Sequence, residues 1–115
     1  MIGMRRWDCN MIHLNVKGLS AAKRTTISTM AHKYEADVIL LQETHVDKNE
    51  LCRLSICGYD LITYHLHNKH GRAAYIKTDR DASASRLEST EFFDTFEAFG
   101  YRFCNVYKSP NAQWR

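Results

Sequence analysis

Asn15 and Glu43 are the two residues whose types best suit metal-ion chemistry in this sequence. A hard cation such as Mg²⁺ prefers oxygen ligands in an octahedral array and keeps several waters, so one carboxylate and one amide carbonyl make a partial site. Spacing alone leaves an alternative for each residue. Asn15 also suits the start of a turn at Lys17-Gly18, and Glu43 also suits an exposed strand end. The pair therefore predicts a candidate site for Mg²⁺ or Mn²⁺.

A strand, a helix and a second strand are predicted around this pair. Residues 11–16 are mostly apolar and predict a short strand. Val38–Leu41 is an uninterrupted run of branched apolar residues, which is typical of a parallel strand covered on both faces. Between them, Ser20 is suited to cap a helix with one apolar stripe. About 30 residues is the size of a right-handed crossover unit. If the two strands are neighbours, Asn15 and Glu43 reach the sheet edge where open α/β folds bind ligands.

Further elements are predicted downstream of the pair. Asp47 and Glu50 have capping-box spacing and predict a short helix, which Gly58 is placed to end. Residues 59–66 and 73–77 predict two antiparallel strands joined by a turn.

Residues 91–107 allow two interpretations. The phenylalanines between positions 91 and 99 fit one face of a helix, but the Phe and Thr content and Gly100 fit a hairpin. A hairpin with residues 101–107 as its return strand is favoured.

Composition limits the class of protein. The chain has 115 residues, of which 44% are hydrophobic and 25% charged, which predicts a single globular domain and excludes a disordered, collagen-like or coiled-coil chain. No segment approaches the roughly 20 apolar residues of a membrane helix, and no secretory signal is evident. The four spread cysteines predict reduced thiols in an intracellular protein, nuclear or cytoplasmic. The net charge of +3 is compatible with a polyanionic partner.

Four blocks of the sequence resemble the endonuclease/exonuclease/phosphatase superfamily. Residues 12–19 are similar to its first strand and turn, and residues 38–45 to its Leu-Gln-Glu-Thr-His segment. Residues 71–76 resemble its Gly-Arg-Gly-Gly-Val-Ala strand and residues 105–111 its Asn-Val-Tyr-x-Pro-Pro segment. The set in this order is more specific than any one block. It looks most like the apurinic-endonuclease-like domain of non-long-terminal-repeat retrotransposons, which nicks target DNA before reverse transcription.

This resemblance implies a fold and an activity. The fold is a truncated four-layer α/β sandwich, with a mixed sheet and flanking helices, and the activity is Mg²⁺-dependent phosphodiester hydrolysis of DNA. By matched position, Asn15 and Glu43 are expected at the metal site and Tyr107 beside the scissile phosphate. The expected nucleic-acid contacts are Lys17, Arg72 and Asn111.

The sequence also departs from the family pattern. Leu14 replaces the usual Trp, and Lys17 replaces the Asn before Gly18. The family's Asp-x-Asn and Asp-His pairs belong after the tyrosine, but residues 108–115 contain no Asp, Glu or His. We therefore expect residues 1–115 to be the N-terminal half of the domain, catalytically crippled alone. An inner sheet face left open is expected to need the missing half-domain or a self-associating copy as its partner.

Three other functions stay open. A truncated nuclease is expected to retain nucleic-acid binding without cleavage, and a phosphatase of the same superfamily shares the same blocks. A zinc module is suggested by His65, His67 and His70 together with Cys52 and Cys57, although neither group has clean ligand-pair spacing.

Overall fold

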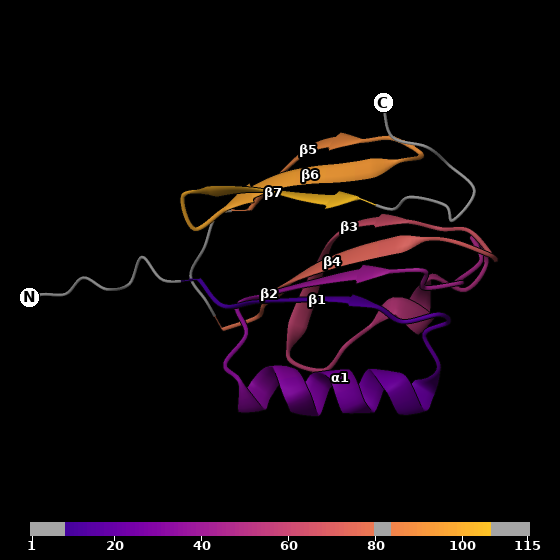
Figure 1. Cartoon of the computed structure of the whole chain (residues 1–115), viewed down its shortest axis with the longest axis horizontal. Helices are drawn as coiled ribbons and strands as arrows, with labels where there is room; N and C mark the ends of the chain where they lie inside the picture. Colours follow the sequence, from indigo (N-terminus) through magenta and orange to yellow (C-terminus); the bar gives the residue numbers. More distant parts are fainter. Residues whose placement is uncertain (1–8, 80–83, 107–115) are drawn as a thin grey trace, which may run out of the picture.

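Two β-sheets and one long helix form the layers of the protein (Figure 1). The structure is a computed structural model and describes residues 9–79 and 84–106. Strands β1, β2, β4 and β3 form a four-stranded sheet in that order, and β5, β6 and β7 form a three-stranded sheet. The elements in chain order are β1 (Met11–Asn15), α1 (Ala21–Lys33), β2 (Val38–Gln42), the 3₁₀ helix η2 (Leu51–Leu54), β3 (Tyr59–His65), β4 (Arg72–Lys77), β5 (Ser85–Ser89), β6 (Phe93–Ala98) and β7 (Tyr101–Val106).

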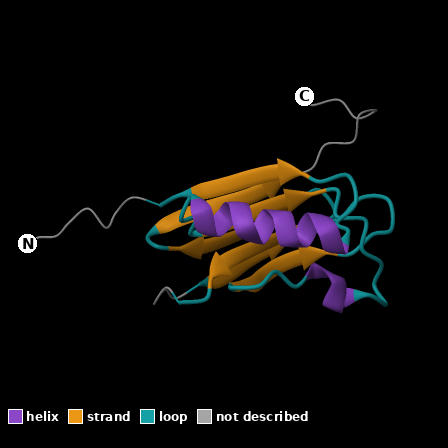
Figure 2. Cartoon of the chain, turned by 90° about the horizontal axis from the view of Figure 1, so that it is seen from below, coloured by secondary structure: helices purple, strands orange, loops and turns teal. Residues whose placement is uncertain are grey.

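The first unit is the predicted strand, helix and strand. β1 and β2 are parallel neighbours, with Asn15 opposite Gln42 at the end of the ladder. The Ser20 hydroxyl accepts a hydrogen bond from the Lys23 amide at 3.2 Å and so caps α1, as its residue type predicted. Figure 2 shows α1 lying across one face of the four-stranded sheet. The unit therefore brings the ends of β1 and β2 to one edge of the sheet.

The two central strands of the four-stranded sheet, β2 and β4, are buried on both faces. Ile39, Leu41 and Tyr75 belong to a core that includes Ile27 and Ala31 of α1. The alternate residues of β2 and β4 face the three-stranded sheet, in a second core of Val38, Leu40, Ala74, Ile76, Phe96 and Ala98. Burial on both faces explains why residues 38–41 are apolar without alternation. The mixed α/β architecture agrees with the predicted fold class.

The prediction of an open inner sheet face is wrong for β2 and β4, whereas the residues of β1 on that face are exposed. β6 and β7 cover that face of β2 and β4, because the chain itself supplies part of the second sheet. On the outer face of the second sheet, residues 9–79 and 84–106 provide no helix. The described part of the chain thus forms three of the four expected layers.

One local prediction differs from the structure, and one strand was not predicted. The helix predicted at Asp47 begins later, at Leu51, and is a single 3₁₀ turn without a side-chain cap. The Glu50 amide donates to the Asp47 carbonyl at 2.9 Å, so the capping-box residues form a turn instead. The hairpin of β6 and β7 is as predicted, whereas β5 was not predicted.

Within the described segments, no helix has the length and apolar character needed to cross a membrane.

Candidate functional site

The side chains of Asn15 and Glu43 lie against each other where β1 and β2 end. Asn15 Nδ2 donates a hydrogen bond to Glu43 Oε2 at 2.7 Å, although the residues are 28 positions apart. Asn15 Oδ1 accepts a hydrogen bond from the Lys17 amide at 3.2 Å. The parallel register places Gln42 beside Asn15, so Glu43 is the first residue beyond the ladder. The crossover unit therefore brings the predicted pair together.

The backbone around the pair is held in an unusual conformation. Lys17, Glu43 and His45 have φ values of 47°, 54° and 56°, in the left-handed region that side chains rarely adopt. Two main-chain hydrogen bonds tie the loops together, from the Gly18 amide to the Glu43 carbonyl at 2.7 Å and from Leu19 to Thr44 at 2.8 Å. Such strain persists only where the surroundings fix it, and it clusters at functional sites. The carboxylate of Glu43 is thus held in a defined direction.

The electrostatic surroundings of Glu43 suit a hard cation. Its side chain is 18% exposed, and Oε1 lies 3.7 Å from His45 Nε2. Mg²⁺ binds oxygens at about 2.0–2.1 Å in an octahedron, so neighbouring ligand atoms are about 2.9 Å apart. The 2.7 Å between Asn15 Nδ2 and Glu43 Oε2 is close to that spacing. A half-turn of the Asn15 amide would bring its oxygen beside Glu43 Oε2, but it would break the hydrogen bonds of Asn15 with Glu43 and with the Lys17 amide.

The remaining predicted site residues have different outcomes. Lys17 is exposed and lies two residues after Asn15, and its amide donates to the Asn15 side chain. Tyr107 and Asn111 lie outside the described residues. Arg72 does not fit its predicted role as a nucleic-acid contact, because its side chain is only 1% exposed.

Arg72 instead joins the two sheets. Its Nε donates to Asp94 Oδ2 at 2.9 Å, and its terminal nitrogens donate to the carbonyls of Thr90 and Glu91. Asp94 is fully buried and also accepts a hydrogen bond from the Ser89 hydroxyl. The guanidinium is occupied inside the protein, so Arg72 is structural.

Asn105 is a second buried polar residue that received no role from the sequence. Its Nδ2 donates to the carbonyls of Leu41 at 3.1 Å and Ala73 at 3.2 Å, which lie on β2 and β4. The sequence signals were its place at the start of the block 105–111 and an amide inside the otherwise mostly apolar segment 103–107. Asp94 gave no such signal, because acidic residues are common in exposed hairpins.

Comparisons with known proteins place the chain in a family. Residues 12–112 match the Endonuclease/Exonuclease/phosphatase family. The chain belongs to this family. In fold it is similar to the crystal structure of the AP endonuclease LMAP from Leishmania major, with a TM-score of 0.64 and 18% sequence identity. The match covers 91% of this chain and 41% of that one, so the chain spans less than half of that enzyme. No curated protein matches the sequence significantly.

The histidine cluster at the β3–β4 turn does not form a zinc site with the cysteines. The rings of His65 and His67 are 6.5 Å apart between centroids, and those of His67 and His70 are 4.8 Å apart. Burial, followed by the charge of Arg72, lowers the pKa of His65. Across residues 9–79 and 84–106, no group of three or more His, Cys, Asp or Glu side chains is arranged to hold a metal. The described residues therefore give the zinc alternative no support.

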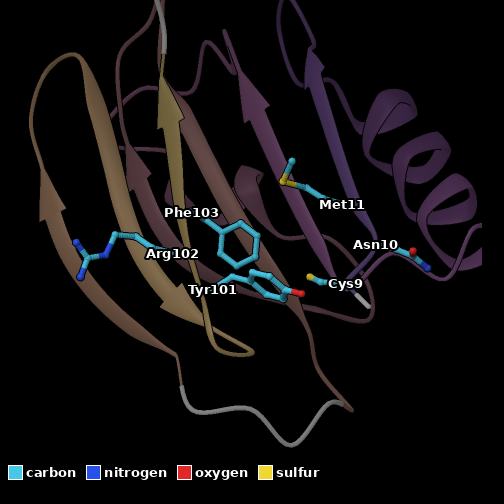
Figure 3. A pocket seen from close by; sticks show the side chains of 6 residues that line it. All are labelled: Cys9, Asn10, Met11, Tyr101, Arg102 and Phe103. Carbon is cyan, nitrogen blue, oxygen red and sulfur yellow. The ribbon is translucent and has the colours of Figure 1, made fainter. Parts of the chain in front are cut away.

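A pocket of about 530 Å³ lies at the opposite end of β1 from Asn15. It is bounded by the residues that open β1 and by the first residues of β7, and Figure 3 shows Met11, Tyr101 and Phe103 directed into it. Arg102 points away from it (Figure 3) and pairs with Glu97 at 2.9 Å. The pocket is separate from the Asn15–Glu43 site.

Proposed function

We propose that this family member is a divalent-metal-dependent phosphodiester hydrolase that acts on DNA. The hydrogen-bonded contact of Asn15 with Glu43 at the sheet edge carries the proposal, because it gathers carboxylate and amide groups where a hard cation can bind. The name of the structural neighbour, an AP endonuclease, supports DNA as the substrate class. The sequence blocks favour the retrotransposon type, and Mg²⁺ or Mn²⁺ is the proposed ion.

Four residues have a proposed part in the reaction. When bound, the divalent ion supplies Lewis-acid stabilisation of the charge that develops on the phosphate oxygens. Glu43 and Asn15 would hold that ion, with the Asn15 amide turned so that its oxygen faces the ion in place of the nitrogen that donates to Glu43. Lys17, exposed beside them, attracts the DNA phosphate. Tyr107, the first residue after β7, is proposed to donate its phenolic hydrogen to the same phosphate.

The reaction also needs a base that takes a proton from water. The family's matching Asp and His positions have no counterpart in residues 108–115. A positioned general base contributes about 10²–10⁴-fold to a rate. We therefore propose that the 115 residues bind metal and DNA but nick slowly.

A plasmid-nicking assay with Mg²⁺ tests the proposal. Glu43→Gln keeps the shape of the side chain but removes its charge, and we expect its nicking rate to fall about 100-fold, the size of loss seen when transition-state charge stabilisation is removed. Glu50→Gln is the matched control, because Glu50 is a half-exposed carboxylate that pairs with Arg53 and not with Asn15. Its rate is expected to stay at the wild-type value. Equal rates for wild type and Glu43→Gln refute the proposal.

Mn²⁺ binding measured by electron paramagnetic resonance separates metal binding from catalysis. Glu43→Gln is expected to weaken Mn²⁺ binding, whereas Glu50→Gln is not. If the wild type binds Mn²⁺ and DNA but makes no nicks, the chain is a binding module without catalysis. If it binds neither, the proposed site is wrong.

A further inference from the structure

One polar rung crosses the four-stranded sheet at the end nearest Glu43. The strand registers place Asn15 beside Gln42, Gln42 opposite Arg72 and Arg72 opposite His65. Residues in register share a face of the sheet, and Arg72 faces the second sheet because it contacts Asp94. We call Asn15, Gln42, Arg72 and His65 the polar rung. It separates the apolar interior of the sandwich from the site.

The second sheet meets this rung with two polar residues of its own. Asp94 on β6 and Asn105 on β7 are register partners, and both are 0% exposed. Asp94 binds Arg72, whereas Asn105 binds the main chain of β2 and β4. The next layer inward, with Leu40, Ala74 and Phe96, is apolar. The sheets are thus joined by directional bonds at the site end.

Directional bonds fix position in a way that apolar contacts do not. The hydrophobic effect scales with buried area and has no preferred direction, so it permits small shifts of one sheet over another. A hydrogen bond weakens steeply when its distance and angle change. The two bonds of Asn105 therefore set where β7 lies over β2 and β4.

The place of these bonds in the chain links them to the site. Leu41, whose carbonyl accepts one bond, is two residues before Glu43. Asn105 is itself one residue before the end of β7, which is followed in sequence by Tyr107. The bonds are therefore made close in sequence to Glu43 and to the end of β7.

We propose that Asn105 is a positioning residue, which holds the end of β7 at a fixed distance from Asn15 and Glu43, the proposed metal ligands at the ends of β1 and β2. The Arg72–Asp94 pair supports it by holding β6, the neighbour of β7. This inference rests on the proposed function for its effect on catalysis, but not for its effect on the structure.

Replacing Asn105 with leucine removes both positioning bonds. The two side chains are similar in size, and Asn105 Oδ1 is buried without a hydrogen-bond partner, so leucine also removes an unfavourable buried atom. A backbone carbonyl oxygen has two lone pairs, so it tolerates the loss of one hydrogen bond better than a backbone amide, which has a single hydrogen to donate. Cys104→Ser is the matched control, because Cys104 is the preceding residue of β7 and is exposed.

The experiment measures Mn²⁺ affinity, nicking kinetics and amide hydrogen exchange for wild type, Asn105→Leu and Cys104→Ser. Because Asn15 and Glu43 are positioned by the first sheet and not by β7, Asn105→Leu is expected to keep the wild-type Mn²⁺ affinity. Its kcat is expected to fall about 100-fold, as for a misplacement of about 1 Å, with little change in KM. Exchange of residues 104–106 is expected to rise about tenfold while that of residues 38–42 stays constant. Cys104→Ser is expected to match wild type in all three.

The outcomes separate this inference from the proposed function. If kcat and exchange at the end of β7 are both unchanged in Asn105→Leu, the inference is overturned. A parallel fall in Mn²⁺ affinity and kcat also overturns it, because that pattern indicates general destabilisation. If the wild type makes no nicks, the proposed function is wrong and the exchange result alone decides whether Asn105 holds β7.

Discussion

Loss of Arg72 should destabilise the protein far more than loss of a surface arginine. Both side chains of the Arg72–Asp94 pair are at most 1% exposed, and their closest atoms are 2.9 Å apart. Arg72→Met leaves the Asp94 carboxylate buried and without its cation, which costs about 3–5 kcal/mol. Two main-chain carbonyls also lose their donor, which favours the upper end of that range. Whole-domain stability is typically about 5–15 kcal/mol, so much of it is at risk.

The chain provides a matched control for this prediction. Arg102 and Glu97 are also 2.9 Å apart and lie on neighbouring strands, but their side chains are 69% and 49% exposed. Water and salt screen such a pair, so Arg102→Met is expected to cost less than about 1 kcal/mol. The two variants share their chemistry and differ in burial.

Urea unfolding followed by circular dichroism measures both costs through linear extrapolation. The double variant Arg72→Met/Asp94→Leu is expected to recover much of the lost stability, because no unpaired charge remains. The reasoning is refuted if Arg72→Met and Arg102→Met have the same free energy of unfolding. A double variant as unstable as Arg72→Met assigns the cost to the carbonyl bonds instead.

Three further predictions use the same unfolding assay. Gly71→Ala should reduce the free energy of unfolding by at least about 1 kcal/mol more than Gly100→Ala. Both glycines have positive φ, but a Cβ added at Gly71 would lie 2.5 Å from Thr44 Oγ1, whereas one added at Gly100 has no atom within 4 Å. Equal costs contradict this prediction. The pKa of His65 is lower in the folded protein than in the unfolded chain, so near pH 6.5 the unfolded chain binds more protons. The free energy of unfolding should therefore decline as the pH falls through about 6.5. His65→Gln should show a smaller decline. Tyr75→Phe should cost about 1 kcal/mol, because the buried hydroxyl donates to a main-chain carbonyl; no loss shows that this bond contributes nothing.

The first unit of the fold was predictable because its signals are local. A cap at Ser20, the buried residues Ile27 and Ala31 and the apolar run at residues 38–41 specify a helix between two strands. Parallel neighbours end at the same edge, so the contact of Asn15 with Glu43 follows from topology alone. The sequence blocks of the family named the same two residues.

The role of Arg72 was not predictable because its partners are distant in sequence. Next to a polar turn it has the pattern of an exposed hairpin residue, but Asp94, 22 residues later, lies over it when the second sheet forms. β5 lacked a signal for a related reason: all five of its residues are exposed, and its position depends on pairing with β6. At Asp47, a local turn replaced the helix that the capping-box pattern favoured.

The positive φ of Glu43 implies a trade-off between folding and chemistry. A residue with a Cβ in the left-handed region costs about 1–2 kcal/mol, and glycine there relieves most of this cost. Glycine also removes the carboxylate, so the most stable residue at this position is one that cannot bind a cation. Selection for stability alone therefore favours glycine over this acidic side chain. Selection for hydrolysis retains the carboxylate despite the free-energy cost of the left-handed backbone.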